Sequence, residues 1–220
     1  MKTSHLERIR CVRCGGRLTV PSGADYVEDG IIECADCSAR FPVIRSVPRL
    51  LEGEMLANCL LFYGEVVALN RELAALDGDE VRDAGRAGTG CAEAEKLKAK
   101  TQKSFTYEWN IWKTMPEFAM NHFLEVMQVE EKFFDGKSGW DPAVGIGRDC
   151  ANALKAVGDG GFMIGSDISY AVDIAYDMCG AAPNALIVQA DLYSPFVPDE
   201  SLDFAYMIGL IQHLTARKKA

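Results

Sequence analysis

Four cysteines near the N-terminus have the spacing of metal ligands. Cys11 and Cys14 form one C-x2-C pair, Cys34 and Cys37 form a second, and nineteen residues separate the pairs. Two such pairs can supply four thiolates to a tetrahedral zinc ion. Four cysteine ligands leave no open coordination position, so the pattern predicts a structural Zn2+ rather than a catalytic one. The alternative is a reduced or disulfide-linked cysteine cluster without metal.

A second set of residues has the spacing of a ligand loop. Gly145 and Gly147 in "GWDPAVGIGRD" would let a ligand approach the backbone closely and would then open a helix with a polar N-terminus. Asp167 follows Gly147 by twenty residues, and a carboxylate at that distance can bind both hydroxyls of a ribose. The spacing fits either a dinucleotide or an adenosyl ligand.

Composition narrows the class of protein. The chain has 220 residues, of which 49% are hydrophobic and 25% charged, as in soluble globular domains. It contains no run of 18 apolar residues, and "MKTSHLERIR" has no apolar signal segment, so we expect no membrane span and a cytoplasmic location. Cysteines in that compartment favour metal over disulfides, and we expect burial for most of the other four, Cys59, Cys91, Cys150 and Cys179.

Charge is unevenly distributed along the chain. The net charge is −9; residues 1–50 hold eight Lys/Arg against six Asp/Glu, which is +2, so the remainder carries −11. A Zn(Cys)4 centre would add a formal −2 to the N-terminal part. An acidic body of this kind disfavours nucleic acid as a partner, although a small RNA target stays open.

The elements that must position these residues can be read from periodicity. In the N-terminal part, residues 17–20 and 31–33 predict the arms of a hairpin. Residues 54–76 predict a helix, 77–91 an exposed linker rich in Gly and charge, and 92–100 a solvated helix. A further helix is predicted over 116–127, where His122 lies in the apolar stripe and should be packed and hydrogen-bonded; the stripe is Phe118, Ala119, His122, Phe123, Val126 and Met127.

Strands and helices alternate from residue 138 onward. Strands are predicted at 162–167, 185–191 and 201–210, with helices at 148–158 and 169–180 between them. Such alternation indicates an α/β fold with a Rossmann-like, doubly wound parallel sheet of about four strands. Ligands bind beyond the carboxyl ends of such strands, where Asp141, the 145–147 loop, Asp167 and Asp191 should meet. We therefore divide the chain into a β-rich zinc ribbon (1–52), a helical connector (53–103) and the sheet domain (104–220).

The sheet domain resembles class I S-adenosylmethionine-dependent methyltransferases of the type 11 kind. "GWDPAVGIGRD" is similar to their first motif, "IGSDIS" to the second and "VQADL" to the third, while "LDFAYMIGLIQHL" resembles the signature after the fourth strand, including Asp203, Gly209 and His213. The resemblance covers about residues 104–216. It implies S-adenosyl-L-methionine as cofactor and these binding residues: Asp141, Ala143, Gly145, Gly147, Asp167, Ile168, Asp191 and Leu192.

Residues 8–52 carry a second resemblance. The two C-x2-C pairs are followed by "FPVIRSVPRLL", which is similar to the ending of a zinc-ribbon family that includes the small activator subunit of tRNA and protein methyltransferases.

Two features depart from the methyltransferase pattern. Ala143 occupies the place of the first loop glycine; an alanine forced to a positive φ would cost about 1 kcal/mol or more, so we expect a weakened site. The chain also ends at Ala220, soon after the fourth strand, where the family has seven strands. We expect a C-terminally truncated domain, or a homodimer or partner chain that covers the edge of strand four.

The leading functional prediction is an enzyme, an S-adenosylmethionine-dependent methyltransferase acting on a small-molecule or biosynthetic acceptor, weakened or inactivated by truncation. His213 is the candidate catalytic base, and a packing or capping role for it is the alternative. Two other functions stay open. One is a non-catalytic or partner-dependent protein that binds the cofactor or another chain, and the other is an RNA methyltransferase.

Overall fold

A computed structural model describes residues 1–76, 98, 100–107, 111 and 120–210 of the chain. The predicted linker at 77–91, the N-terminal part of the predicted 116–127 helix, and His213 lie outside these described residues.

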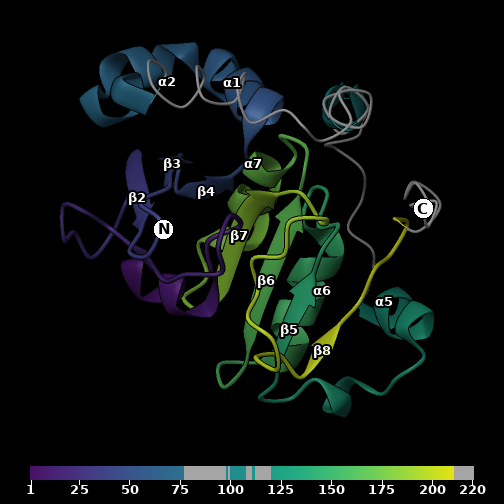
Figure 1. Cartoon of the computed structure of the whole chain (residues 1–220). Coiled ribbons are helices and arrows are strands. Elements are labelled where there is room, and N and C mark those ends of the chain that lie inside the picture. The colour runs from purple at the N-terminus through teal and green to yellow at the C-terminus, as the bar shows by residue number, and fades with distance from the viewer. Residues whose placement is uncertain (77–97, 99, 108–110, 112–119, 211–220) are drawn as a thin grey trace, which may run out of the picture.

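One sheet runs through the described part of the chain (Figure 1). Its strand order is β1-β2-β3-β4-β7-β6-β5-β8. The strands β1 to β4 pair antiparallel, and β4, β7, β6, β5 and β8 pair parallel. The strands are β1 (Leu18–Thr19), β2 (Gly30–Cys34), β3 (Arg40–Ile44), β4 (Val47–Leu50), β5 (Ser138–Asp141), β6 (Phe162–Asp167), β7 (Ala185–Ala190) and β8 (Phe204–Ala205).

The parallel strands confirm the predicted Rossmann-like α/β fold. Two helices cross between them: α6 (Arg148–Val157) joins β5 to β6, and α7 (Val172–Ala175), extended by a π-helical turn at Tyr176–Gly180, joins β6 to β7. The strands predicted at 162–167 and 185–191 agree with β6 and β7 to within a residue. The strand predicted at 201–210 is wrong in length, because only Phe204 and Ala205 pair with β5.

The glycine at position 139 in β5 makes room for the side chain of Phe204 in β8. Gly139 pairs with Phe204, and a Cβ built on Gly139 would lie 2.1 Å from the Phe204 ring. The aromatic ring therefore occupies the space that an aliphatic side chain of β5 would fill, so Phe204 compensates for the glycine.

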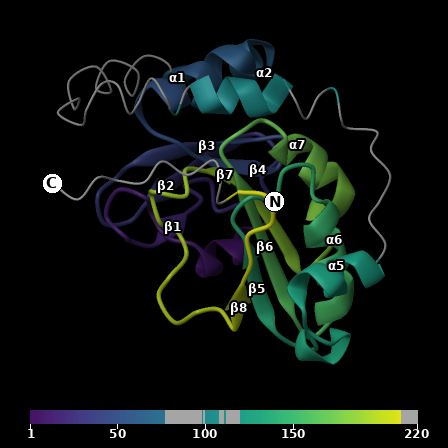
Figure 2. The same ribbon diagram turned by 90° about the vertical axis from the view of Figure 1, so that its right-hand side faces the viewer.

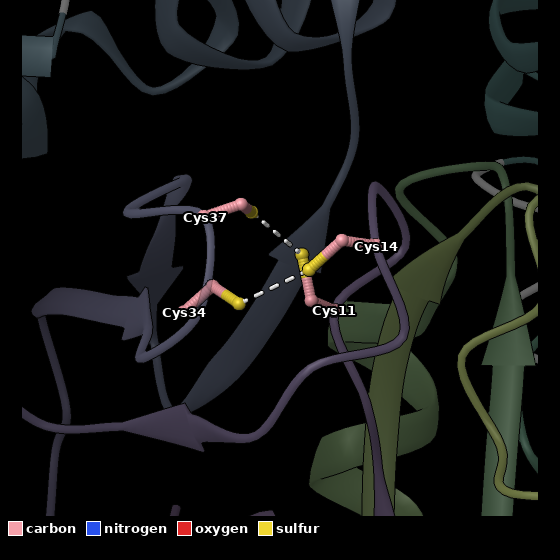
Figure 3. A group of neighbouring side chains, drawn as sticks. All are labelled: Cys11, Cys14, Cys34 and Cys37. Atoms are coloured by element: carbon pink, nitrogen blue, oxygen red, sulfur yellow. Dashed lines mark hydrogen bonds between the residues drawn. The ribbon is translucent and has the colours of Figure 1, made fainter.

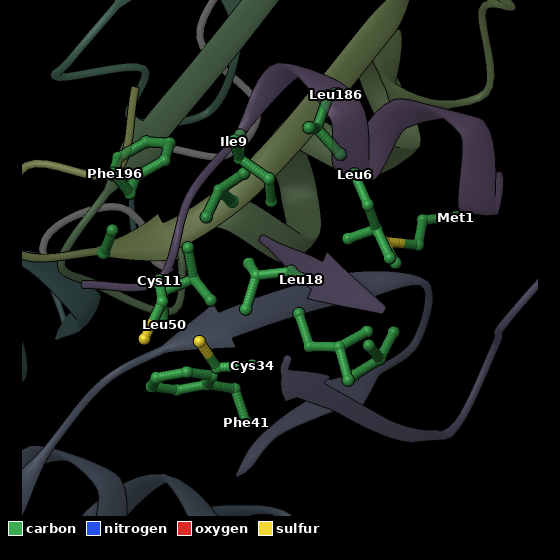
Figure 4. Packing of buried hydrophobic residues seen from close by; sticks show 14 of the residues in the cluster. Met1, Leu6, Ile9, Cys11, Leu18, Cys34, Phe41, Leu50, Leu186 and Phe196 are labelled. Carbon is green, nitrogen blue, oxygen red and sulfur yellow. The ribbon is translucent and has the colours of Figure 1, made fainter. Parts of the chain in front are cut away.

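Each face of the parallel strands has its own cover (Figure 2). On one face, Met163 and Ile187 pack against α6, α7 and α5 (Met120–Met127). On the other face, Ile164, Leu186 and Val188 pack against the N-terminal segment, as the close view in Figure 4 shows for Leu6, Ile9 and Leu186. The alternation along β6 and β7 follows the two-residue period of a strand buried on both sides.

The N-terminal region joins the sheet through β4. Arg45 and Ser46 both have positive φ and form a two-residue loop between β3 and β4, the geometry that suits the twist of a hairpin. The next residues then pair parallel with β7, with Arg49 beside Gln189 and Leu50 beside Ala190. The predicted ribbon thus shares a sheet and a hydrophobic cluster with the parallel strands.

The connector is helical but interrupted. The predicted 54–76 helix divides into α1 (Gly53–Phe62), α2 (Gly64–Leu69) and a helix at 71–76. The last begins at Asn70, whose Oδ1 accepts hydrogen bonds from the backbone N–H groups of Glu72 and Leu73. Within the described residues, no helix is both long and apolar enough to cross a bilayer.

The apolar face predicted for the 116–127 helix is correct at Phe123 and Met127 and wrong at His122 and Val126. In α5, Phe123 is fully buried, Met120, Leu124 and Met127 pack partly against the same cluster, and Val126 and His122 are exposed. His122 is therefore not a packed core residue. In the described part of the helix the buried positions follow the i, i+3, i+4, i+7 pattern from Met120, so the helical period is confirmed, with Met120 and Leu124 on the buried face in place of His122 and Val126.

Candidate functional site

The four N-terminal cysteines converge on one point (Figure 3). Their Sγ atoms all lie within 4.8 Å of one another; Cys11 and Cys37 are 3.8 Å apart, and Cys14 and Cys34 are 3.5 Å apart. Zinc–sulfur bonds of about 2.3 Å in a tetrahedron place sulfur atoms about 3.8 Å apart. The four thiols therefore fit a tetrahedral zinc ion.

The backbone around these sulfurs forms a close cradle. The N–H of Arg13 donates to Cys11 Sγ and the N–H of Gly16 donates to Cys14 Sγ, both at 3.4 Å. A Cβ on Gly16 would lie 2.9 Å from Cys34 Sγ, so only glycine fits there. Burial raises the pKa of the Cys11 thiol to about 12. Such a buried thiol ionises readily only beside a cation, which a bound Zn2+ would provide.

A second group of functional side chains lies at the carboxyl edge of the parallel strands. Asp141 ends β5, Asp167 ends β6 and Asp191 directly follows β7. Because neighbouring parallel strands end at the same edge, the three carboxylates predicted from the sequence share one edge of the sheet. Ile168 and Leu192, which were also predicted as cofactor-binding residues, follow Asp167 and Asp191 and are half-buried.

The loop after β5 adopts a compact turn. Gly145 and Gly147 have φ values of +51° and +93°, which favour glycine. Ala143 does not have a positive φ, and its N–H donates to Asp141 Oδ1 at 3.2 Å. The expected backbone strain at Ala143 is therefore wrong: the left-handed positions of this loop are taken by the two glycines, and the alanine lies where its methyl group is tolerated.

Asp167 holds this loop in place. Its Oδ2 accepts a hydrogen bond from the Gly145 N–H at 3.1 Å, and its Oδ1 accepts from both the N–H and the hydroxyl of Ser169. The backbone N–H of Ile168 also donates to Asp167, so several hydrogen bonds hold this carboxylate in position at the end of β6. Burial raises the pKa of Asp167, although these hydrogen bonds act in the opposite direction.

Asp141 is the most deeply placed of the three carboxyl groups. Only 3% of it is exposed, and burial raises its pKa to about 7. Tyr206, which follows β8, is also buried, and its side chain interacts with that of Asp141. Burial and the negative charge of Asp141 raise the pKa of Tyr206 well above its usual value.

Asp191 has a partner that sequence reasoning missed. Lys98 forms an ion pair with Asp191 Oδ2, so the prediction that residues 92–100 form only a solvated helix is wrong at Lys98. A cavity of about 130 Å³ lies here, lined by Lys98, Asp191, Ser194 and residues 50 and 52–55 at the end of β4 and the start of α1. It is smaller than the ~300–1,000 Å³ of typical small-molecule sites, so it can hold only part of such a ligand.

No protein-family model matches the chain, and no curated protein matches its sequence. Several solved structures are similar in part. A SAM-dependent methyltransferase from Aquifex aeolicus has 20% identity and a TM-score of 0.35 over 41% of this chain and 48% of that one.

Two others have 24% identity and a TM-score of 0.32. An arsenic(III) S-adenosylmethionine methyltransferase from Chlamydomonas reinhardtii matches over 42% of this chain and 39% of its own, and a protein-L-isoaspartate O-methyltransferase over 40% and 27%. The chain thus spans less than half of each of these structures. Similarity at this level assigns no activity, so function must be argued from the site itself.

Proposed function

We propose that this chain binds S-adenosylmethionine at the carboxyl edge of β5, β6 and β7 and belongs to a methyltransferase that acts on a small-molecule acceptor. The observation that carries the proposal is the hydrogen bond from the Gly145 N–H to Asp167 Oδ2 at 3.1 Å. It joins the glycine loop after β5 to the acid that ends β6, two motifs that match the methyltransferase order in the sequence. Asp191 after β7 supplies the third motif at the same edge.

The residues at this edge fit an adenosyl ligand. Asp167 offers a carboxylate to the ribose hydroxyls at this edge, and the absence of side chains at Gly145 and Gly147 lets a ligand approach the backbone. The buried Asp141 suits a cationic group, since a positive charge beside it would relieve the cost of its ionisation. The bound cofactor would supply a methyl group on a positively charged sulfur that is already activated as a leaving group.

What the protein has to contribute to methyl transfer is mainly orientation and exclusion of water. Helical residues 100–107 support the second role, because Thr106 accepts a hydrogen bond from the Tyr170 N–H, three residues beyond Asp167. They therefore lie close to the ribose-binding acid. We keep His213 as the proposed base for an acceptor that must lose a proton.

We propose that Cys11, Cys14, Cys34 and Cys37 hold a structural zinc ion. Their sulfur separations and the Gly16 cradle support this assignment. The zinc centre would stabilise the region that supplies β4 to the sheet and Leu6 and Ile9 to the core on one face of it.

Calorimetric titration of the zinc-loaded chain with S-adenosylhomocysteine tests the proposed cofactor site. We expect one site per chain with micromolar affinity. Asp167→Asn should weaken binding at least tenfold, because the amide cannot accept all the hydrogen bonds that Asp167 makes. Asp177→Asn is the matched control, since Asp177 is exposed on the π-helical turn and should leave affinity unchanged. A folded chain that gives no heat at millimolar ligand contradicts the proposal.

A further inference from the structure

Three residues spaced by four lie on one face of the helical residues 98 and 100–107, the teal helix beside α1 and α2 at the top of Figure 2. Lys98 forms its ion pair with Asp191, at the end of β7. Thr106 accepts the hydrogen bond from Tyr170, beyond the end of β6. Residues four apart share a helix face, so Gln102, midway between them, also lies over the carboxyl ends of β6 and β7.

Gln102 is buried without hydrogen-bond partners for its side-chain amide within the described part of the chain. Its side chain is 0% exposed, yet neither Oε1 nor Nε2 has a hydrogen-bond partner among the described residues. Buried polar groups are almost always paired, because losing water without a replacement is costly. Gln189 shows the ordinary pattern in this chain: it is equally buried, but its Oε1 accepts from Arg49 and its Nε2 donates to the carbonyl of Ile168.

The unpaired atoms of Gln102 define what a ligand must offer. A carboxamide presents one acceptor and two donors side by side in a plane, so its complement is a flat group with an adjacent donor and acceptor. The edge of adenine that carries the 6-amino group has this arrangement, and glutamine pairs with it through two hydrogen bonds in nucleic-acid recognition.

Asp191, at the same edge of the sheet, makes contacts of its own. Asp191 Oδ2 is paired with Lys98, and its Oδ1 accepts the N–H of Tyr193 at 3.1 Å. A carboxylate can only accept hydrogen bonds, whereas a carboxamide can donate and accept at once, so Gln102 matches the amino edge of adenine better than Asp191 does. We propose that Gln102 is the residue that recognises the adenine of the adenosyl ligand, through paired hydrogen bonds to its amino edge. This inference rests on the proposed cofactor site.

The Gln102→Met substitution separates a ligand-binding role from a structural one. Methionine has nearly the same length but no polar amide, so it removes the unpaired atoms and keeps the packing. We expect Gln102→Met to raise the melting temperature of the ligand-free chain and to weaken binding of S-adenosylhomocysteine at least tenfold. Gln128→Met makes the same chemical change at an exposed position and should alter neither quantity.

A second ligand identifies the group that Gln102 reads. S-adenosylhomocysteine and its analogue without the 6-amino group should differ at least tenfold in affinity for the wild-type chain, because the analogue leaves the Gln102 oxygen unpaired. The two ligands should bind Gln102→Met with nearly equal affinity. Calorimetry with two proteins and two ligands gives the four constants needed.

The outcomes separate this inference from the proposed function. If the wild-type chain binds S-adenosylhomocysteine but Gln102→Met retains the same preference for the amino group, the cofactor site stands and the role of Gln102 is overturned. A lower melting temperature for the ligand-free variant, with unchanged affinity, also overturns it and makes Gln102 a structural residue. A folded wild-type chain that binds neither ligand removes the proposed function and this inference with it.

Discussion

Nη2 of Arg49 lies 2.5 Å from Oδ1 of Asp173, and this ion pair joins β4 to α7. Arg49 is 0% exposed, and its guanidinium also donates to Gln189 Oε1 on β7 and to the carbonyl of Ile44. The hydroxyl of Tyr63, between α1 and α2, donates to Asp173 Oδ2 at 2.7 Å. One buried charge pair thus connects the N-terminal hairpin, the connector helices and the sheet.

Loss of the Arg49 guanidinium should destabilise the whole chain. Arg49→Met leaves Asp173 without its closest cation and removes the hydrogen bonds that Arg49 donates to Gln189 and Ile44, so we expect a loss of about 3–5 kcal/mol in the free energy of unfolding. Arg45→Met is the matched control, because Arg45 is 63% exposed and lies 3.6 Å from the same carboxylate; it should cost no more than about 0.5 kcal/mol. Urea unfolding measures both, and equal losses would contradict this account of the pair.

Zinc removal should unfold more than the cysteine loops. Because Leu6 and Ile9 pack on β6 and β7, and β4 pairs with β7, we expect a strong chelator to lower the melting temperature of the parallel sheet as well. Circular dichroism during chelation and re-addition of zinc tests this. A sheet transition that is independent of chelator would show that the two regions fold separately.

Two cysteine variants distinguish metal binding from packing. Cys14 is exposed, so Cys14→Ala removes little buried surface, whereas Cys59 is fully buried outside the cluster. If zinc holds the N-terminal region, Cys14→Ala should lose the metal and destabilise the chain more than Cys59→Ala, which should retain one zinc per chain. Metal analysis and thermal unfolding give the two readouts, and a reversed order of stability would count against zinc.

Gly147 should tolerate alanine poorly for two separable reasons. Its φ is +93°, and a Cβ there would lie 2.9 Å from the Cα of Ala175 in α7. Gly158 also has a positive φ, +62°, but a Cβ there meets nothing within 4 Å. We expect Gly158→Ala to cost about 1–2 kcal/mol from backbone conformation alone, and Gly147→Ala to cost about 1–3 kcal/mol more from overpacking. Chemical denaturation measures the difference, and equal costs would show that α7 moves aside freely.

Affinity for a cationic ligand should depend on the ionisation of Asp141. Burial raises its pKa to about 7, and Tyr206, Asp149 and Asp167 are its charged or polar neighbours. A positive group bound beside Asp141 favours the carboxylate, so binding releases a proton near neutral pH. The affinity for S-adenosylmethionine should therefore rise between pH 6 and pH 8, and calorimetry in buffers of different ionisation enthalpy should detect the proton.

Ionisation of Asp141 should lower the stability of the ligand-free chain as the pH rises, although it favours binding of a cationic ligand. A folded-state pKa above the unfolded value means that the folded chain holds the proton more tightly, so Asp141 contributes most stability below about pH 4 and loses it as the pH rises through about 7. The loss is at most about 4 kcal/mol, at about 1.4 kcal/mol for each unit of pKa. Asp141→Asn should flatten this part of the profile in urea unfolding measured from pH 5 to pH 8.5; an unchanged slope would assign it to other groups.

Local patterns in the sequence determined the parts of this protein that depend on neighbouring residues. The two C-x2-C pairs predicted the cysteine cluster, because a short hairpin can only bring such pairs together at one end. Glycine spacing and the aspartates that end apolar runs predicted β6, β7 and the shared edge of Asp141, Asp167 and Asp191. The division into ribbon, connector and sheet domain stays a prediction.

Only the tertiary structure decided which distant segments meet. Nothing in the local pattern of Val47–Leu50 indicates that it pairs with β7, because strand pairing depends on packing across the whole sheet rather than on propensity. The register of α5, the contact of Lys98 with Asp191 and the burial of Gln102 were missed for the same reason. A lysine or glutamine in a charged helix is ordinarily solvated, and it becomes a site residue only when the helix lies across the ends of two strands.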